Sequence, residues 1–135
     1  MRNEPNIVAI IQARMGSPRL PGKVLMEVAD GYTMLDAVID RVAAAQLVNR
    51  IVVATTERPE DDAIAHAATE WAGVDAFRGP EHDVLARYYW AALNAEADGI
   101  VRITADCPLI EPTLIDFCVA WWRCRPTCYM SNCFP

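Results

Sequence analysis

The loop Ala13–Lys23 holds most of the side chains in this sequence that could do chemistry. It contains Arg14, Arg19 and Lys23, and Lys23 is the only lysine in the chain. Residues 5–26 include no Asp or Glu, although the whole chain has 18 acidic and 12 basic residues. Accessible backbone N–H groups at glycines and cationic side chains together bind anions. The loop therefore predicts a polyphosphate-binding site, and a solvated basic loop is the alternative.

Two common phosphate motifs do not fit this loop. Gly16 and Gly22 enclose five residues, whereas a Walker loop needs four before its Gly-Lys pair. Val24 also stands where that motif needs Ser or Thr to bind magnesium. The chain has no G-x-G-x-x-G sequence, so we do not expect it to bind NAD or FAD.

A second candidate group follows an apolar run near residue 100. The segment Thr104–Leu109 contains Asp106, and Pro108 restricts the turn after it. A carboxylate at the end of a strand is the hard oxygen ligand that Mg²⁺ prefers when phosphates and water complete its shell. We therefore expect Asp106 to be a magnesium ligand. A turn-forming Asp, bonded to nearby backbone N–H groups, is the alternative.

These residues are connected by a regular alternation of strands and helices. The expected strands are 7–11, 50–54, 74–77 and 100–104, and the expected helices begin after Thr33 and at Pro59, Asp83 and Glu111. This alternation predicts an α/β fold with a parallel sheet. Ligands bind beyond the carboxyl ends of the strands in such sheets. Arg14, Arg78 and Asp106 each follow a strand and should share that edge.

The loop Ala13–Lys23 resembles the nucleotide loop of the cytidylyltransferases that activate acidic sugars such as acylneuraminate and 3-deoxy-manno-octulosonate. It matches their pattern x-A-R-x-G-S-x-R-L-P-G-K without a break. Four more blocks follow in the order of that family: Val53–Thr56, Phe77–Gly79, Asp83–Tyr89 and Arg102–Ile110. The amino-acid sequence of these blocks is most similar to that of the spore-coat polysaccharide biosynthesis protein F branch of the family.

The resemblance implies a three-layer, Rossmann-like nucleotidyltransferase fold of the glycosyltransferase A type, with a mainly parallel sheet. It implies that residues 1–135 are the N-terminal portion, a single domain that forms the nucleotide-binding half. Tyr129–Asn132 resembles a family strand that continues into the acceptor-sugar half. That half normally supplies a second metal carboxylate, so we expect a C-terminally truncated chain.

The function implied by the resemblance is transfer of CMP from CTP to an acidic or related sugar, with release of pyrophosphate, in surface polysaccharide biosynthesis. Arg14 and Lys23 would be the catalytic residues, and Asp106 would bind Mg²⁺. The implied nucleotide-binding residues are Ala13, Arg14, Gly16, Ser17, Arg19, Lys23, Arg78, Gly79 and Asp83. The alternative is a catalytically silent nucleotide-binding fragment without the acceptor half.

Selection of the base is the least determined part of this site. Arg78 and Gly79 occupy positions where similar enzymes contact the pyrimidine: Arg can donate to cytosine O2 and N3, and Gly leaves room for the ring. Asp83 has a competing role as the N-cap of a helix, in an exposed pair with Arg87 four residues later. We interpret Tyr88–Trp90 as core residues of that helix.

Composition restricts the other classes of function. A chain of 135 residues with 53% hydrophobic and 22% charged residues is typical of one globular domain. A net charge of −6 argues against nucleic-acid binding. No apolar stretch approaches the ~18 residues of a membrane span, and the N-terminus has no signal-peptide core. We expect a cytoplasmic protein that binds neither nucleic acid nor membrane. The sequence is compatible with a homodimer.

Four of the five cysteines lie in the last 18 residues, at positions 118, 124, 128 and 133. None of them forms the tight C-x2-C pair that is usual in zinc sites. Structural disulfides are rare in intracellular proteins. We therefore expect unligated thiols.

Overall fold

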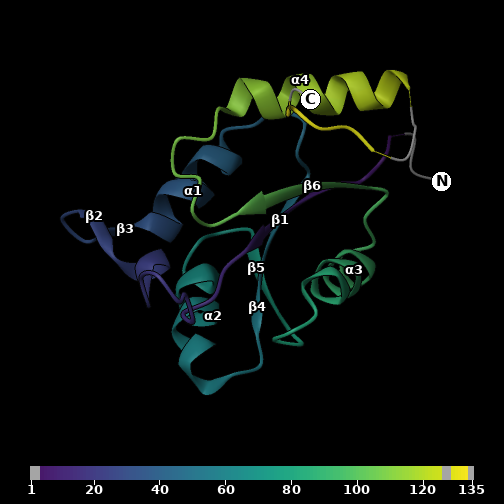
Figure 1. Ribbon diagram of the computed structural model, residues 1–135. Helices are drawn as coiled ribbons and strands as arrows, with labels where there is room; N and C mark the ends of the chain where they lie inside the picture. The colour runs from purple at the N-terminus through teal and green to yellow at the C-terminus, as the bar shows by residue number, and fades with distance from the viewer. Residues whose placement is uncertain (1–3, 126–128, 134–135) are drawn as a thin grey trace.

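The computed structural model describes residues 4–125 and 129–133, and its centre is a four-stranded parallel sheet (Figure 1). The strands lie in the order β5-β4-β1-β6. Their bounds are β1 Ile7–Gln12, β4 Arg50–Thr56, β5 Val74–Gly79 and β6 Gly99–Thr104. Because the chain order reverses at β1, the carboxyl ends of β1 and β6 form the switch point at which ligands bind in such sheets.

Helices cover both faces of the sheet, which gives three layers (Figure 1). The residues of β1 alternate between the two faces, as expected for a strand. Ile7, Ala9 and Ile11 pack in the core formed by α1 Met34–Ala43, α2 Asp62–Thr69 and α4 Pro112–Cys124. Val8 and Ile10 pack in the other core, against α3 Val84–Asn94. The expected α/β fold is confirmed.

The first helix begins at the predicted position because Thr33 caps it. The backbone N–H of Asp36 donates to Thr33 Oγ1 (3.2 Å), and the Asp36 carboxylate accepts from the Thr33 backbone N–H (2.8 Å). This reciprocal pair is a capping box. Trp71 Nε1 also donates to Asp36, at 2.8 Å, and so ties the end of α2 to the start of α1.

Some elements differ from the sequence expectation. A hairpin of β2 Glu27–Ala29 and β3 Tyr32–Thr33 was not predicted, because its strands are too short for a periodic signal. It projects away from the sheet at the left of Figure 1. Tyr129–Asn132 forms no strand in the described chain, so that expectation is wrong for this structure.

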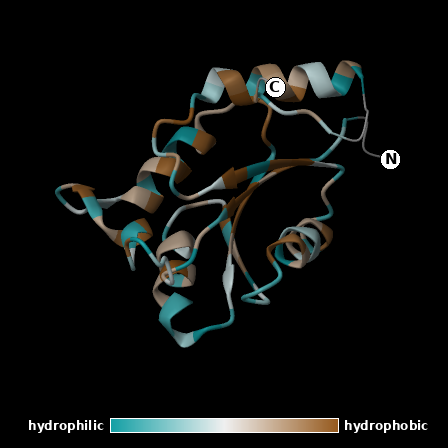
Figure 2. Ribbon diagram, viewed as in Figure 1, coloured by the Kyte–Doolittle hydropathy of each residue, from teal (hydrophilic) through white to brown (hydrophobic). Residues whose placement is uncertain are grey.

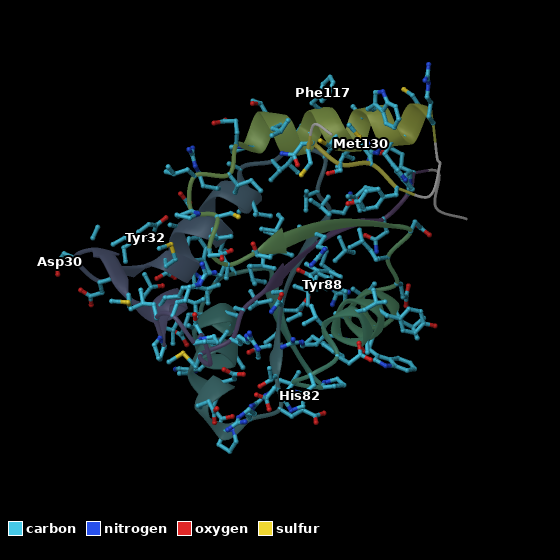
Figure 3. All side chains as sticks on the ribbon, viewed as in Figure 1. Asp30, Tyr32, His82, Tyr88, Phe117 and Met130 are labelled. Atoms are coloured by element: carbon cyan, nitrogen blue, oxygen red, sulfur yellow. The ribbon has the colours of Figure 1, made fainter. Side chains whose placement is uncertain are left out.

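The interpretation of Tyr88–Trp90 as core residues is right for only one of the three. Tyr88 is buried, points from α3 toward the sheet (Figure 3), and donates from its hydroxyl to the Ile103 carbonyl at 2.8 Å. Tyr89 and Trp90 are 58% and 50% exposed. Consecutive helix residues point about 100° apart, so all three cannot face one sheet. In Figure 2, brown apolar residues run through the central strands and also occur on parts of the helices.

The C-terminal helix α4 packs on the sheet through one face. Ile115 and Val119 are buried, while Cys118 and Trp122 are half-buried. Phe117 is exposed and points away from the sheet (Figure 3).

Within residues 4–125 and 129–133, no helix has the length and apolarity needed to cross a membrane. The described cysteines at 107, 118, 124 and 133 are free thiols, and Cys128 lies outside the described residues.

Candidate functional site

The basic loop after β1 is held in shape by backbone hydrogen bonds. The N–H of Ala13 donates to the Ala54 carbonyl of β4 at 3.0 Å. The Met15 carbonyl then accepts from the N–H groups of both Ser17 (2.9 Å) and Gly22 (2.8 Å). The two ends of the loop therefore lie together, and the segment between them bulges from the carboxyl edge of the sheet.

The two glycines of the loop differ in role. Gly22 has φ +71°, a left-handed conformation that disfavours side chains, and it leads into the 3-10 turn Lys23–Leu25. Gly16 has no such φ, and a Cβ atom added there would meet nothing within 4 Å. The N–H groups of Arg14 and Gly16 donate to no acceptor among residues 4–125 and 129–133. Gly16 thus leaves open space beside two available donors, which suits an anion.

The three cations of the loop point to different parts of the edge. Lys23 reaches the end of β6, where its Nζ lies 3.1 Å from Asp106 Oδ2. Arg14 is exposed and lies within the electrostatic range of Glu81 and Arg87, beyond β5. Arg19 is exposed on the loop itself. Within the described chain, neither Arg14 nor Arg19 forms a side-chain hydrogen bond or ion pair, so both guanidinium groups are available to a ligand.

Asp106 lies at the switch point, as the sequence predicts. Its Oδ1 accepts from Thr104 Oγ1 at 2.6 Å, and its Oδ2 faces Lys23. These two hydrogen bonds, first that of Thr104 and then that of Lys23, hold the pKa of the Asp106 carboxyl below its usual value. Its side chain is 49% exposed. The site therefore presents an ionised, accessible carboxylate beside a lysine.

Arg78 is bound on three sides by protein groups. Its Nε donates to the Thr56 carbonyl (2.9 Å) and its Nη2 to the Arg58 carbonyl (2.7 Å). Its Nη1 donates to Asp62 Oδ1 at 2.5 Å. Arg has five N–H donors, so two stay available to a base. Recognition of the pyrimidine by Arg78 remains a prediction.

Gly79 is buried, and its position has a packing reason. A Cβ atom added to Gly79 would lie 2.9 Å from Arg87 Cγ and 3.1 Å from the Phe77 ring. The side chain of Arg87 therefore packs directly against Gly79, and the contact of Gly79 with a pyrimidine remains a prediction.

The expected exposed pair of Asp83 and Arg87 is wrong. Asp83 does cap α3, because its Oδ1 accepts from the Ala86 N–H at 2.8 Å. Arg87, however, is completely buried and forms no ion pair with Asp83. The periodicity of α3 turns position 87 toward the sheet, where the missing side chain of Gly79 accommodates it.

Asp61 is a site residue that the sequence analysis missed. It is 1% exposed, and its Oδ1 accepts from the Met15 N–H at 2.7 Å. Its Oδ2 accepts a very short hydrogen bond from Thr56 Oγ1. This carboxylate therefore fixes the basic loop to the end of β4. A run of three acidic residues at 60–62 suggests a helix start, and nothing in it distinguishes Asp61.

Comparison with known proteins agrees with this geometry. The family model described as cytidylyltransferase matches residues 8–134. The 3-deoxy-manno-octulosonate cytidylyltransferase of Geobacter sulfurreducens is 40% identical over 116 residues, which cover 85% of this chain and 44% of the relative. The spore coat polysaccharide biosynthesis protein SpsF of Bacillus subtilis is 37% identical over 116 residues, covering 82% and 47%.

A solved structure supports the same relation. The cytidylyltransferase of Leptospira borgpetersenii superposes with a TM-score of 0.84 at 38% identity, and the match covers 90% of this chain and 50% of that one. The chain spans about half the length of the curated relatives it matches. Both the resemblance and the expected nucleotidyltransferase-like fold are confirmed, and the chain belongs to the cytidylyltransferase family.

Proposed function

We propose that residues 1–135 form the nucleotide-binding half of an enzyme that transfers CMP from CTP to a sugar and releases pyrophosphate. The observation that carries this proposal is the meeting of Lys23 and Asp106 at the switch point, beside a loop with available N–H donors. The matched relatives are named for 3-deoxy-manno-octulosonate and for spore coat polysaccharide, which supports an acidic or related sugar and a role in surface polysaccharide biosynthesis.

The chemistry needs no covalent enzyme intermediate. The sugar hydroxyl oxygen attacks the α-phosphorus in line, and the bond to the pyrophosphate oxygen breaks. Negative charge grows on the leaving pyrophosphate, and Arg14, Arg19, Lys23 and the N–H of Gly16 can stabilise it. Catalysis in this half is therefore positioning and electrostatic stabilisation. A cytoplasmic location, where CTP is available, is part of the proposal.

The donors of the site fit one hard divalent cation that is held largely by its substrate. Asp106 gives one accessible carboxylate. Among the described residues, no group of three His, Cys, Asp or Glu side chains could hold a metal ion. Mg²⁺ binds proteins through one or two carboxylates plus substrate phosphates, so Asp106 would hold it with the triphosphate of CTP. When bound, the ion neutralises phosphate charge.

A catalytically silent nucleotide-binding fragment is the second candidate, because the chain spans about half of its relatives. Two measurements on the full chain separate the candidates: calorimetric binding of CTP, and pyrophosphate release from CTP with a panel of sugar acids. Binding with release supports the transferase. Binding without release supports the silent fragment, and absence of CTP binding contradicts both.

The role of Asp106 is testable by Asp106→Asn, which keeps the size and one acceptor oxygen but removes the charge. We expect the wild type to bind CTP more tightly with magnesium than with EDTA, and the variant to show no such difference. Metal-free affinity should change by less than about threefold, because the lost ion pair with Lys23 is exposed. Paired titrations measure this, and an equal magnesium effect in both proteins would identify Asp106 as a turn residue only.

A further inference from the structure

Arg87 is a buried cation without a direct counter-ion in the part of the chain that the structure describes. Its side chain is completely buried in the first turns of α3. Its Nη2 donates to the Glu81 carbonyl at 3.4 Å, which is a long hydrogen bond. Its Nε and Nη1 are buried and have no hydrogen-bond partner among residues 4–125 and 129–133. Unpaired buried charges are costly, so two free donors on a buried guanidinium indicate that they serve an acceptor from outside the chain.

The other charges around Arg87 do not satisfy it. Among the described residues, Asp61 is the other buried charged residue, but both its oxygens already accept from Met15 and Thr56. Burial lowers the pKa of the Arg87 guanidinium, and the positive charge of Arg14 lowers it further, against the opposing effect of Asp61. The positive charges of Arg14 and Arg87 therefore repel each other, and an anion close to both would relieve that repulsion.

Glu81 carries a carboxylate within the electrostatic range of both Arg14 and Arg87. Its carboxylate accepts from Arg58 Nη1 at 3.0 Å, and its backbone carbonyl accepts from Arg87 Nη2. The hydrogen bond from Arg58 lowers the pKa of the Glu81 carboxyl despite burial, and the charge of Arg14 contributes to the same shift. The contact with Arg58 lies on the surface, and an exposed ion pair is a weak restraint. A polyphosphate can therefore displace Glu81.

We propose that Arg14 and Arg87 together bind the phosphate chain of the nucleotide, and that Glu81 occupies this anion position until the phosphates displace it. This inference rests on the proposed function, because it assigns further residues to the same nucleotide site. Arg14 belongs to the loop already described, whereas Arg87 and Glu81 are new to the site. Arg87 adds two donor nitrogens, Nε and Nη1, on the β5 side of the sheet, whereas the Lys23–Asp106 pair lies at the end of β6.

The test uses inorganic tripolyphosphate and CTP as probes, titrated calorimetrically into the full chain at low salt. Arg87→Lys keeps the charge but loses the guanidinium donors, and it should weaken tripolyphosphate binding about tenfold. Glu81→Gln removes the competing charge and should strengthen it about threefold. The control is Arg50→Lys, because Arg50 pairs with Asp75 at the opposite end of β4, and its affinity should stay within about twofold of wild type.

Circular dichroism and thermal unfolding check that each variant is folded. Wild-type affinity in Arg87→Lys, or weaker binding in Glu81→Gln, overturns the inference. If Arg87→Lys does not fold, Glu81→Gln still decides, because it leaves Arg87 in place. If the wild type binds CTP no more tightly than tripolyphosphate and the variants respond as expected, the anion site stands and the cytidylyl assignment fails. If CTP binds tightly but neither variant changes its affinity, the cytidylyl assignment stands and the proposed anion site fails.

Discussion

Replacing Arg14 and Lys23 together with alanine should weaken CTP binding about a hundredfold or more. Each side chain can make a charge-assisted hydrogen bond to phosphate, worth ~1.5 to 3 kcal/mol, so losing two exceeds the ~2.7 kcal/mol of a hundredfold change. The fold should tolerate the change. Arg14 has no side-chain partner among the described residues, and Lys23 has one exposed ion pair, with Asp106.

Calorimetric titration of CTP measures this effect. The control is the double variant Arg50→Ala and Arg123→Ala, which also removes two positive charges but at the opposite edge, where the two arginines pair with Asp75 and Glu4. It should bind CTP within about threefold of wild type, because charges far from a ligand are screened by salt. Equal dissociation constants for the loop variant and the wild type would show that this loop is not the phosphate cradle.

Asp61→Ala should lower the free energy of unfolding by about 3 kcal/mol, because it leaves the Met15 N–H and the Thr56 hydroxyl without their acceptor. For a chain of 135 residues this corresponds to a fall in melting temperature of about 10 °C. Asp61→Asn keeps an acceptor for the Met15 N–H, so it should lower the free energy of unfolding by about half as much. The same substitutions should weaken CTP binding, since the loop loses its anchor to β4.

Thermal and denaturant unfolding of both Asp61 variants give the measurement. Asp62→Ala is the matched control, because Asp62 is the adjacent acidic residue but is exposed and forms an ion pair with the Arg78 side chain. Its loss should be below about 1 kcal/mol. If Asp61→Ala were no less stable than Asp62→Ala, the buried carboxylate would not be the anchor of the loop.

Local patterns in the sequence determined the elements and the edge at which the site lies. The alternation of the four sheet strands with four helices could be predicted, because each apolar run and each apolar helix stripe lies within a single element. Thr33 and Asp83 cap helices where the sequence predicts, since a cap acts over only three residues. The proposed phosphate cradle could be predicted for the same reason, because its glycines and cations lie in one loop.

Only the tertiary structure decided which of these groups meet. Lys23 and Asp106 are 83 residues apart, and they meet because β1 pairs with β6. Asp61 holds the Met15 N–H because β1 also pairs with β4, and the three acidic residues at 60–62 look alike in sequence. Arg87 is buried because Gly79 has no side chain at the point where α3 crosses β5. Such contacts depend on strand order and on the rotation of a helix against a sheet, neither of which is encoded within a few neighbouring residues.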